Sequence, residues 1–149
     1  MDPSGRCGRQ VAVTFAVSDT VYSLTRQGIP IGKVRTPFVD FRYPTSRPEA
    51  VRQGDPRARN EWMASFDLVT AVYWTSDGDL VIPYQTFDQG QPVWQLLGMS
   101  PDGDRRFDIR NTTRLLTSDA PGSRFYFVAP GAAAQNRWLV AQLAPSDGL

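Results

Sequence analysis

Residues 66–110, which read FDLVTAVYWTSDGDLVIPYQTFDQGQPVWQLLGMSPDGDRRFDIR, decide the fold of this chain. Apolar and aromatic stretches alternate here with short polar turns, and two of those turns contain the pair Asp-Gly. Asp-Gly between apolar runs is a strong hairpin signal, because glycine readily adopts the left-handed backbone conformation that tight turns need. The stretch therefore predicts antiparallel strands at 66–74, 80–87, 92–99 and 105–110.

Strand signals continue on both sides of this stretch. Alternating apolar residues predict a strand at 11–17, and two more strands are expected at 20–24 and 29–39. The two prolines of the last segment are typical of an edge or bulged strand. On the C-terminal side, strands are expected at 113–117, 124–130 and 137–144. The chain is thus predicted to be all-β, with antiparallel sheets of about ten short strands.

One segment, residues 40–60, differs from the strands around it. Its 21 residues include five arginines and three prolines, which predicts a long basic loop. Asp55 followed by Pro56 is a typical helix start, since Asp can cap the first turn and Pro fits the first helical position. We therefore expect one short helix near 56–65.

The length of 149 residues, of which 41% are hydrophobic, suits one domain and is too short for two ordinary ones. Residues 10–144 are expected to form this single β domain, with the basic loop inside it. The segments 1–9 and 145–149 are rich in Gly, Pro, Ser and Asp and are predicted to be tails.

Parts of the chain also resemble a known class of β proteins. The runs YWTSDGDLVIPYQTF (73–87), VWQLLGMSPDGDRRFDIR (93–110) and SRFYFVAP (123–130) combine a tryptophan, two Asp-Gly hairpins and an aromatic closing strand. Over roughly residues 11–144, the chain resembles the C-terminal blades of six-bladed β-propeller proteins of GC-rich bacteria. At about 40–50 residues per blade it holds about three blades, too few for a ring of six. This implies a partial propeller whose open edges need a partner; a self-contained β-sandwich is the alternative.

Composition argues against several kinds of chemistry. The chain has no histidine, one cysteine and one lysine, so Ser-His-Asp and Cys-His machinery and the HExxH zinc motif are absent. Five aspartates in or beside the predicted turns are expected to bond nearby backbone amides, and their spacing matches no calcium loop. They are Asp77, Asp79, Asp102, Asp104 and Asp108. We therefore predict a protein that is not an enzyme and that holds no cofactor or metal.

Charge and hydropathy limit the partners. Sixteen basic and fifteen acidic residues leave a formal net charge of +1, so no nucleic acid is expected as a partner. No run of about 18 apolar residues is present, so no transmembrane segment is predicted. We expect a soluble protein. The sequence does not indicate its compartment, and the periplasm and the periphery of a membrane are the candidates.

The basic loop supplies the candidate binding residues. Arginines interleaved with aromatic rings can contact phosphates, headgroups or an acidic protein surface, although a solvated loop offset by four acidic residues is the alternative. The candidates are Arg42, Tyr43, Arg47, Arg52, Arg57, Arg59 and Trp62.

Together these features predict a non-catalytic accessory subunit that docks on other subunits of a larger protein assembly through this loop and the edge of strand 29–39. The resemblance to bacterial proteins extends this to the soluble face of a membrane complex, with a photosynthetic reaction centre as one candidate. The alternative is a carbohydrate- or other ligand-binding β module.

Overall fold

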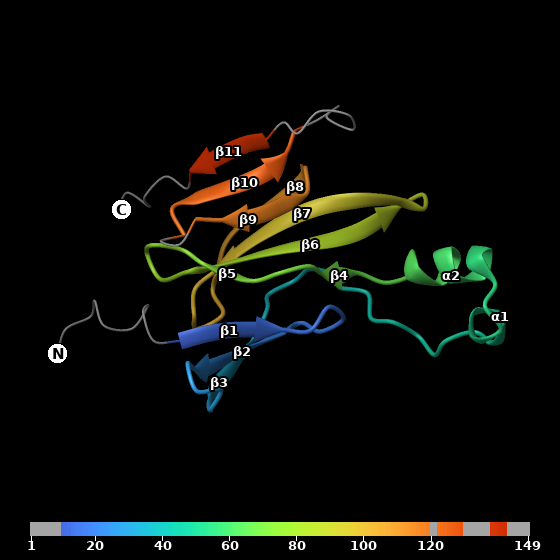
Figure 1. Cartoon of the computed structure of the whole chain (residues 1–149), viewed down its shortest axis with the longest axis horizontal. Helices are drawn as coiled ribbons and strands as arrows, with labels where there is room; N and C mark the ends of the chain where they lie inside the picture. Colours follow the sequence, from blue (N-terminus) through green and yellow to red (C-terminus); the bar gives the residue numbers. More distant parts are fainter. Residues whose placement is uncertain (1–9, 120–121, 130–137, 143–149) are drawn as a thin grey trace.

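A computed structural model describes residues 10–119, 122–129 and 138–142 of the chain (Figure 1). These residues form three antiparallel sheets, with eleven strands in all, and two helices, one of them short. The predicted all-β class and the predicted number of strands are therefore confirmed. The tails predicted at 1–9 and 145–149 lie outside the described residues, as do the ends of the last two predicted strands.

The N-terminal sheet is a meander in which each strand pairs with the next. Its strands are β1 (Gln10–Thr14), β2 (Thr20–Thr25) and β3 (Pro30–Arg35). The strand β3 lies at the edge of the sheet, and its register against β2 shifts between Ser23 and Leu24. An edge or bulged strand was expected here, but β3 is shorter than predicted. It ends before Pro37, which lacks the N–H that a further ladder bond requires.

The central sheet is formed by residues 68–112, which include the two Asp-Gly turns. Its strands are β4 (Leu68–Val69), β5 (Tyr73–Trp74), β6 (Leu80–Asp88), β7 (Gln91–Met99) and β8 (Arg105–Thr112). The order is β4-β6-β7-β8, and β5 also pairs with β6. Gly78 and Gly103, in the two predicted Asp-Gly turns, have φ of 87° and 99°, as such hairpins require.

The single strand predicted at 66–74 is wrong, because the chain forms two short strands separated at 70–72. The backbone N–H and the hydroxyl of Thr70 both donate to the carbonyl of Pro83, at 3.0 and 3.1 Å. Pro83 lies in β6 and has no N–H to return a bond, so the ladder is interrupted opposite it.

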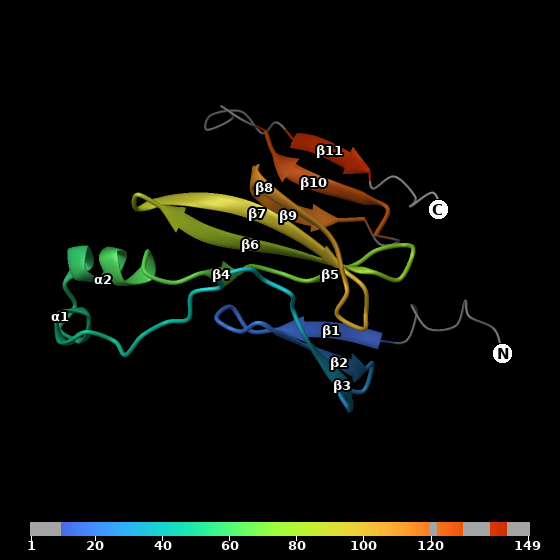
Figure 2. The same cartoon turned by 180° about the vertical axis from the view of Figure 1, so that it is seen from behind.

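The C-terminal sheet has the order β11-β10-β9. Its strands are β9 (Leu115–Ser118), β10 (Arg124–Val128) and β11 (Trp138–Gln142). Figures 1 and 2 show the three sheets as stacked layers, with the central sheet between the other two. Each sheet is formed by one continuous stretch of the chain.

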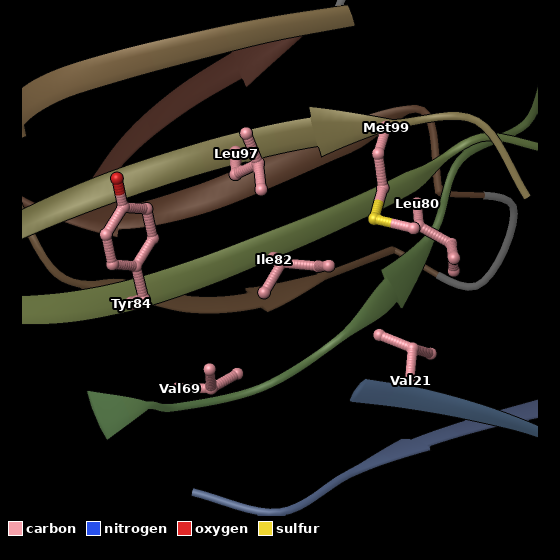
Figure 3. Packing of buried hydrophobic residues seen from close by; sticks show 7 residues of the cluster. All are labelled: Val21, Val69, Leu80, Ile82, Tyr84, Leu97 and Met99. Atoms are coloured by element: carbon pink, nitrogen blue, oxygen red, sulfur yellow. The ribbon is translucent and has the colours of Figure 1, made fainter. Parts of the chain in front are cut away.

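Both faces of the central sheet are buried. One face presents Leu80, Ile82, Tyr84, Leu97 and Met99, which pack with Val69 and with Val21 of the N-terminal sheet (Figure 3). On the other face, Val81 and Leu96 pack against three residues of the C-terminal sheet. Those three are Leu115, Phe125 and Phe127. Each large apolar side chain buried in these interfaces stabilises the fold by about 1.5–3 kcal/mol.

The segment predicted as a basic loop is not a plain loop, because it contains α1 (Glu49–Arg52) and the first residues of α2 (Pro56–Met63). The helix expected near 56–65 is confirmed as α2. Its N-cap is Asp55, whose Oδ1 accepts bonds from the N–H groups of Arg57 and Ala58 at 2.9 and 3.3 Å. The helix α1 begins after Pro48 without a side-chain cap, so the sequence carries no capping signal for it.

Candidate functional site

The helices belong to a helical arm, residues 44–65, that lies beyond the strands at one end of the molecule (Figures 1 and 2). Arg42 and Asp67 hold its base. The Arg42 guanidinium donates to Asp67 Oδ1 through Nε at 3.0 Å and Nη2 at 2.7 Å. Two further bonds of 2.9 Å join the same residues. The backbone N–H of Arg42 donates to Asp67 Oδ2, and the backbone N–H of Asp67 donates to the carbonyl of Arg42. Arg42 therefore stabilises the base of the arm.

Trp62 is the centre of the arm. Its indole N–H donates to the carbonyl of Thr45 at 3.4 Å, and its ring meets Phe66 edge-on with centroids 5.1 Å apart. The guanidinium of Arg47 lies 5.6 Å from the centroid of the Trp62 ring, within range of a cation–π interaction. Arg47 and Trp62 therefore hold the extended residues before α1 against α2.

The remaining arginines of the arm face water. Arg52 pairs with Glu49 at 3.3 Å and Arg57 with Glu61 at 3.0 Å, and all four side chains are at least 62% exposed. Such exposed pairs contribute about 0–1 kcal/mol to stability, so breaking them costs little. Arg59 is exposed and forms no ion pair with any residue that the structure describes. These three guanidinium groups are open to a partner.

Tyr43 is separated from this group and lines a cleft of about 400 Å³ beside the N-terminal sheet. Arg35 Nε bonds Asp19 Oδ2 at 2.5 Å in this cleft, and the Tyr43 hydroxyl lies beside both side chains. The cleft is lined by Asp19, Arg35, Thr36, Pro37, Phe38, Asp40, Phe41 and Tyr43. Sequence reasoning missed the contact of Asp19 with Arg35, because 16 residues separate them and no motif marks either one.

The charge state of this cleft is fixed near neutral pH. Partial burial raises the pKa of Asp19, but the neighbouring Tyr43 hydroxyl and Arg35 guanidinium outweigh burial, so the pKa lies below its ordinary value. The Asp19 carboxylate in turn raises the pKa of Tyr43 and also that of Arg35. Asp19 therefore stays ionised, Tyr43 neutral and Arg35 cationic, and none of the three exchanges a proton near pH 7.

The described ranges contain no group of three or more His, Cys, Asp or Glu able to hold a metal ion. Among the helices of the described part of the chain, none combines the length and apolar character needed to cross a membrane.

Comparison of the chain with protein-family models, curated proteins and solved structures found no match. The resemblance to propeller blades therefore stays a prediction.

Proposed function

We propose that this protein is a non-catalytic accessory subunit that docks on a larger protein assembly through its helical arm. The observation that carries this proposal is that no residue of α1 or α2 is buried. Helices of four and eight residues are marginal in water on their own and depend on packing against something else. A partner surface would supply that packing.

The arm also has the charge pattern of a specific polar interface. Residues 44–65 contain four arginines and three acidic residues, so the net charge is only +1 while both signs are closely spaced. Closely spaced charges of both signs contribute more to the specificity and register of an interface than to its affinity. Arg52 and Arg57 are free to pair with carboxylates on the assembly, because their present pairs are exposed and weak, and Arg59 has no ion pair among the described residues.

The carbohydrate alternative receives less support. Sugar-binding modules commonly present a flat aromatic platform, and the ring in the cleft beside the N-terminal sheet that is most open to solvent is Tyr43, at 47% exposure. Its ring is tilted by 69° to that of Phe41, so the two rings form no common plane. The narrower predictions, a membrane complex and a photosynthetic reaction centre, rest on the resemblance alone and stay predictions.

The test is a triple substitution of the exposed arginines, Arg52→Ala, Arg57→Ala and Arg59→Ala. Its matched control replaces three exposed arginines outside the arm, Arg106, Arg110 and Arg124, and therefore makes the same change in net charge. Tagged chains are expressed in the native host, and the proteins that co-purify in stoichiometric amounts are quantified at low and high salt.

We expect the arm variant to recover about tenfold less partner at low salt, since loss of about 1.4 kcal/mol of binding energy has that effect. The control should recover the native amount, and both variants should melt near the native temperature. A native chain that purifies alone as a monomer would refute the proposal. An arm variant that retains its partner would refute the choice of surface.

A further inference from the structure

The N-terminal sheet has an outer face that its own chain does not cover. In the strand register, Val11 lies opposite Leu24, Val13 opposite Tyr22, and Tyr22 opposite Lys33, which places these side chains on one face. Val21 alternates with them and enters the core on the side of the central sheet. The side chains that share a face with Tyr22 therefore point away from the central sheet.

This outer face is largely apolar. The exposed fractions are 43% for Val11, 61% for Phe15 and 52% for Ile31. Phe15 follows β1 and contacts Tyr22 edge-on, with ring centroids 5.8 Å apart. Tyr22 thus restricts the Phe15 ring, so a partner that covers it loses little side-chain entropy. Contiguous apolar patches that neighbouring residues hold in place are typical of interaction sites.

The rim of the face is basic. Residues 10–36 contain three basic residues and one acidic residue, a net charge of +2 against +1 for the whole chain. Arg35 is already paired with Asp19. Arg26 and Lys33 are exposed and form no ion pair with any residue in the described ranges. The face therefore offers apolar contact together with two unpaired cations.

The edge of the sheet is less suited to binding than its face. The edge strand β3 begins at Pro30, carries Lys33 and has an irregular register against β2. Proline, lysine and bulges are the usual devices that prevent strand addition to an open edge. This argues against the expected docking through the edge of strand 29–39 and favours a partner that lies flat on the sheet.

We propose that this outer face is a second docking surface, and that it binds an apolar protein surface fringed by Asp or Glu side chains. The proposal rests on the proposed function, since it requires a protein partner. A second copy of the chain is a poor occupant, because it brings the same positive rim. An anionic membrane is also a poor occupant, because surfaces that bind anionic lipids typically cluster about four to eight basic residues, and this face offers two unpaired cations.

Two variants test the surface. The face variant carries Phe15→Ser and Ile31→Ser, and the rim variant carries Arg26→Glu and Lys33→Glu. The control carries Leu116→Ser and Val140→Ser, which change exposed apolar residues of the C-terminal sheet. Each is compared with the native chain by co-purification from the host, while a benzoylphenylalanine crosslinker at position 31 identifies the contacted peptide.

We expect both test variants to recover at least tenfold less partner, with the rim effect shrinking at high salt. The control should bind normally, all variants should melt near the native temperature, and the crosslinked peptide should contain apolar residues beside Asp or Glu. Normal recovery by the face variant while the arm variant fails would overturn this inference and leave the proposed function standing. A native chain that recovers no partner overturns both.

Two further assays test the alternative occupants, a second copy of the chain and an anionic membrane. Sedimentation velocity of the native chain at rising concentration detects self-association, and co-sedimentation with vesicles of equal parts phosphatidylcholine and phosphatidylserine detects membrane binding. We expect a monomer in the first assay and no binding in the second. Dimerisation that Phe15→Ser abolishes, or vesicle binding that the rim variant abolishes, would overturn the assignment to a partner protein.

Discussion

Four hairpin turns of this chain share one arrangement of side chain and glycine. In each, the side chain of the first residue accepts a bond from the backbone N–H four residues later, at 2.8 to 3.1 Å. Its carbonyl accepts from the N–H of a glycine three residues later, and that glycine has positive φ. The first residues are Thr25, Thr75, Ser100 and Asp119. In the two Asp-Gly turns, the hydroxyls of Thr75 and Ser100 therefore accept the backbone bond that was expected of the turn aspartates.

This arrangement predicts which substitutions a turn tolerates. Thr25→Ala removes the acceptor for the Ile29 N–H and should lower the free energy of unfolding by about 1 kcal/mol. Thr25→Asp should restore most of it, because Asp119 fills the same position in the fourth turn. Urea denaturation of the three proteins measures both effects. Equal stability of the Ala and Asp variants would contradict the role of the side chain.

At the scale of elements, local signals were sufficient for some structures and not for others. The helix α2 and the Asp-Gly hairpins follow from residues that are neighbours in sequence, so they could be predicted. The break at 70–72 depends on Pro83 in another strand, and Asp19 meets Arg35 only after β2 and β3 pair. Among the candidate binding residues, the sequence could not separate Arg42, which holds Asp67, from Arg59, which faces water.

The anchor of the arm can be tested directly. Arg42→Ala leaves the carboxylate of Asp67, whose side chain is 4% exposed, without its cation. Because water reaches the 42% exposed arginine, we expect a loss of about 2 kcal/mol in the free energy of unfolding, below the roughly 3–5 kcal/mol lost when a fully buried pair is broken. Amides at 44–65 should then exchange hydrogen roughly 30-fold faster, while those of β6 and β7 keep their rates. Arg59→Ala is the control, and faster exchange of the arm in that variant as well would contradict a specific anchor.

At the scale of the whole molecule, the layers meet at a few tight backbone contacts. A Cβ at Gly122, in the turn between β9 and β10, would lie 2.0 Å from the carbonyl oxygen of Trp74 in β5. The Gly122 carbonyl also accepts the N–H of Ser76 at 3.2 Å. The C-terminal sheet thus approaches the central sheet at a point where only glycine fits.

Two glycine substitutions separate conformation from contact. Gly122 and Gly90 both have positive φ, 71° and 77°, but nothing lies within 4 Å of a Cβ at Gly90. Gly90→Ala should cost about 1 kcal/mol for the backbone conformation alone. Gly122→Ala should cost about 1–3 kcal/mol more, because the layers must move apart. Thermal unfolding compares them, and equal melting temperatures would show that the contact is not tight.

The assignment of one continuous stretch of chain to each sheet also sets an order of events during synthesis. The N-terminal sheet is complete at Arg35, but the central sheet that covers its inner face is complete only at Thr112, 77 residues later (112 − 35). At about 5–20 residues per second, the ribosome needs roughly 4–15 s for that interval. Throughout it, the nascent chain presents a three-stranded sheet with both faces open to water. We therefore expect the nascent chain to need chaperones most early in translation, before its middle layer emerges.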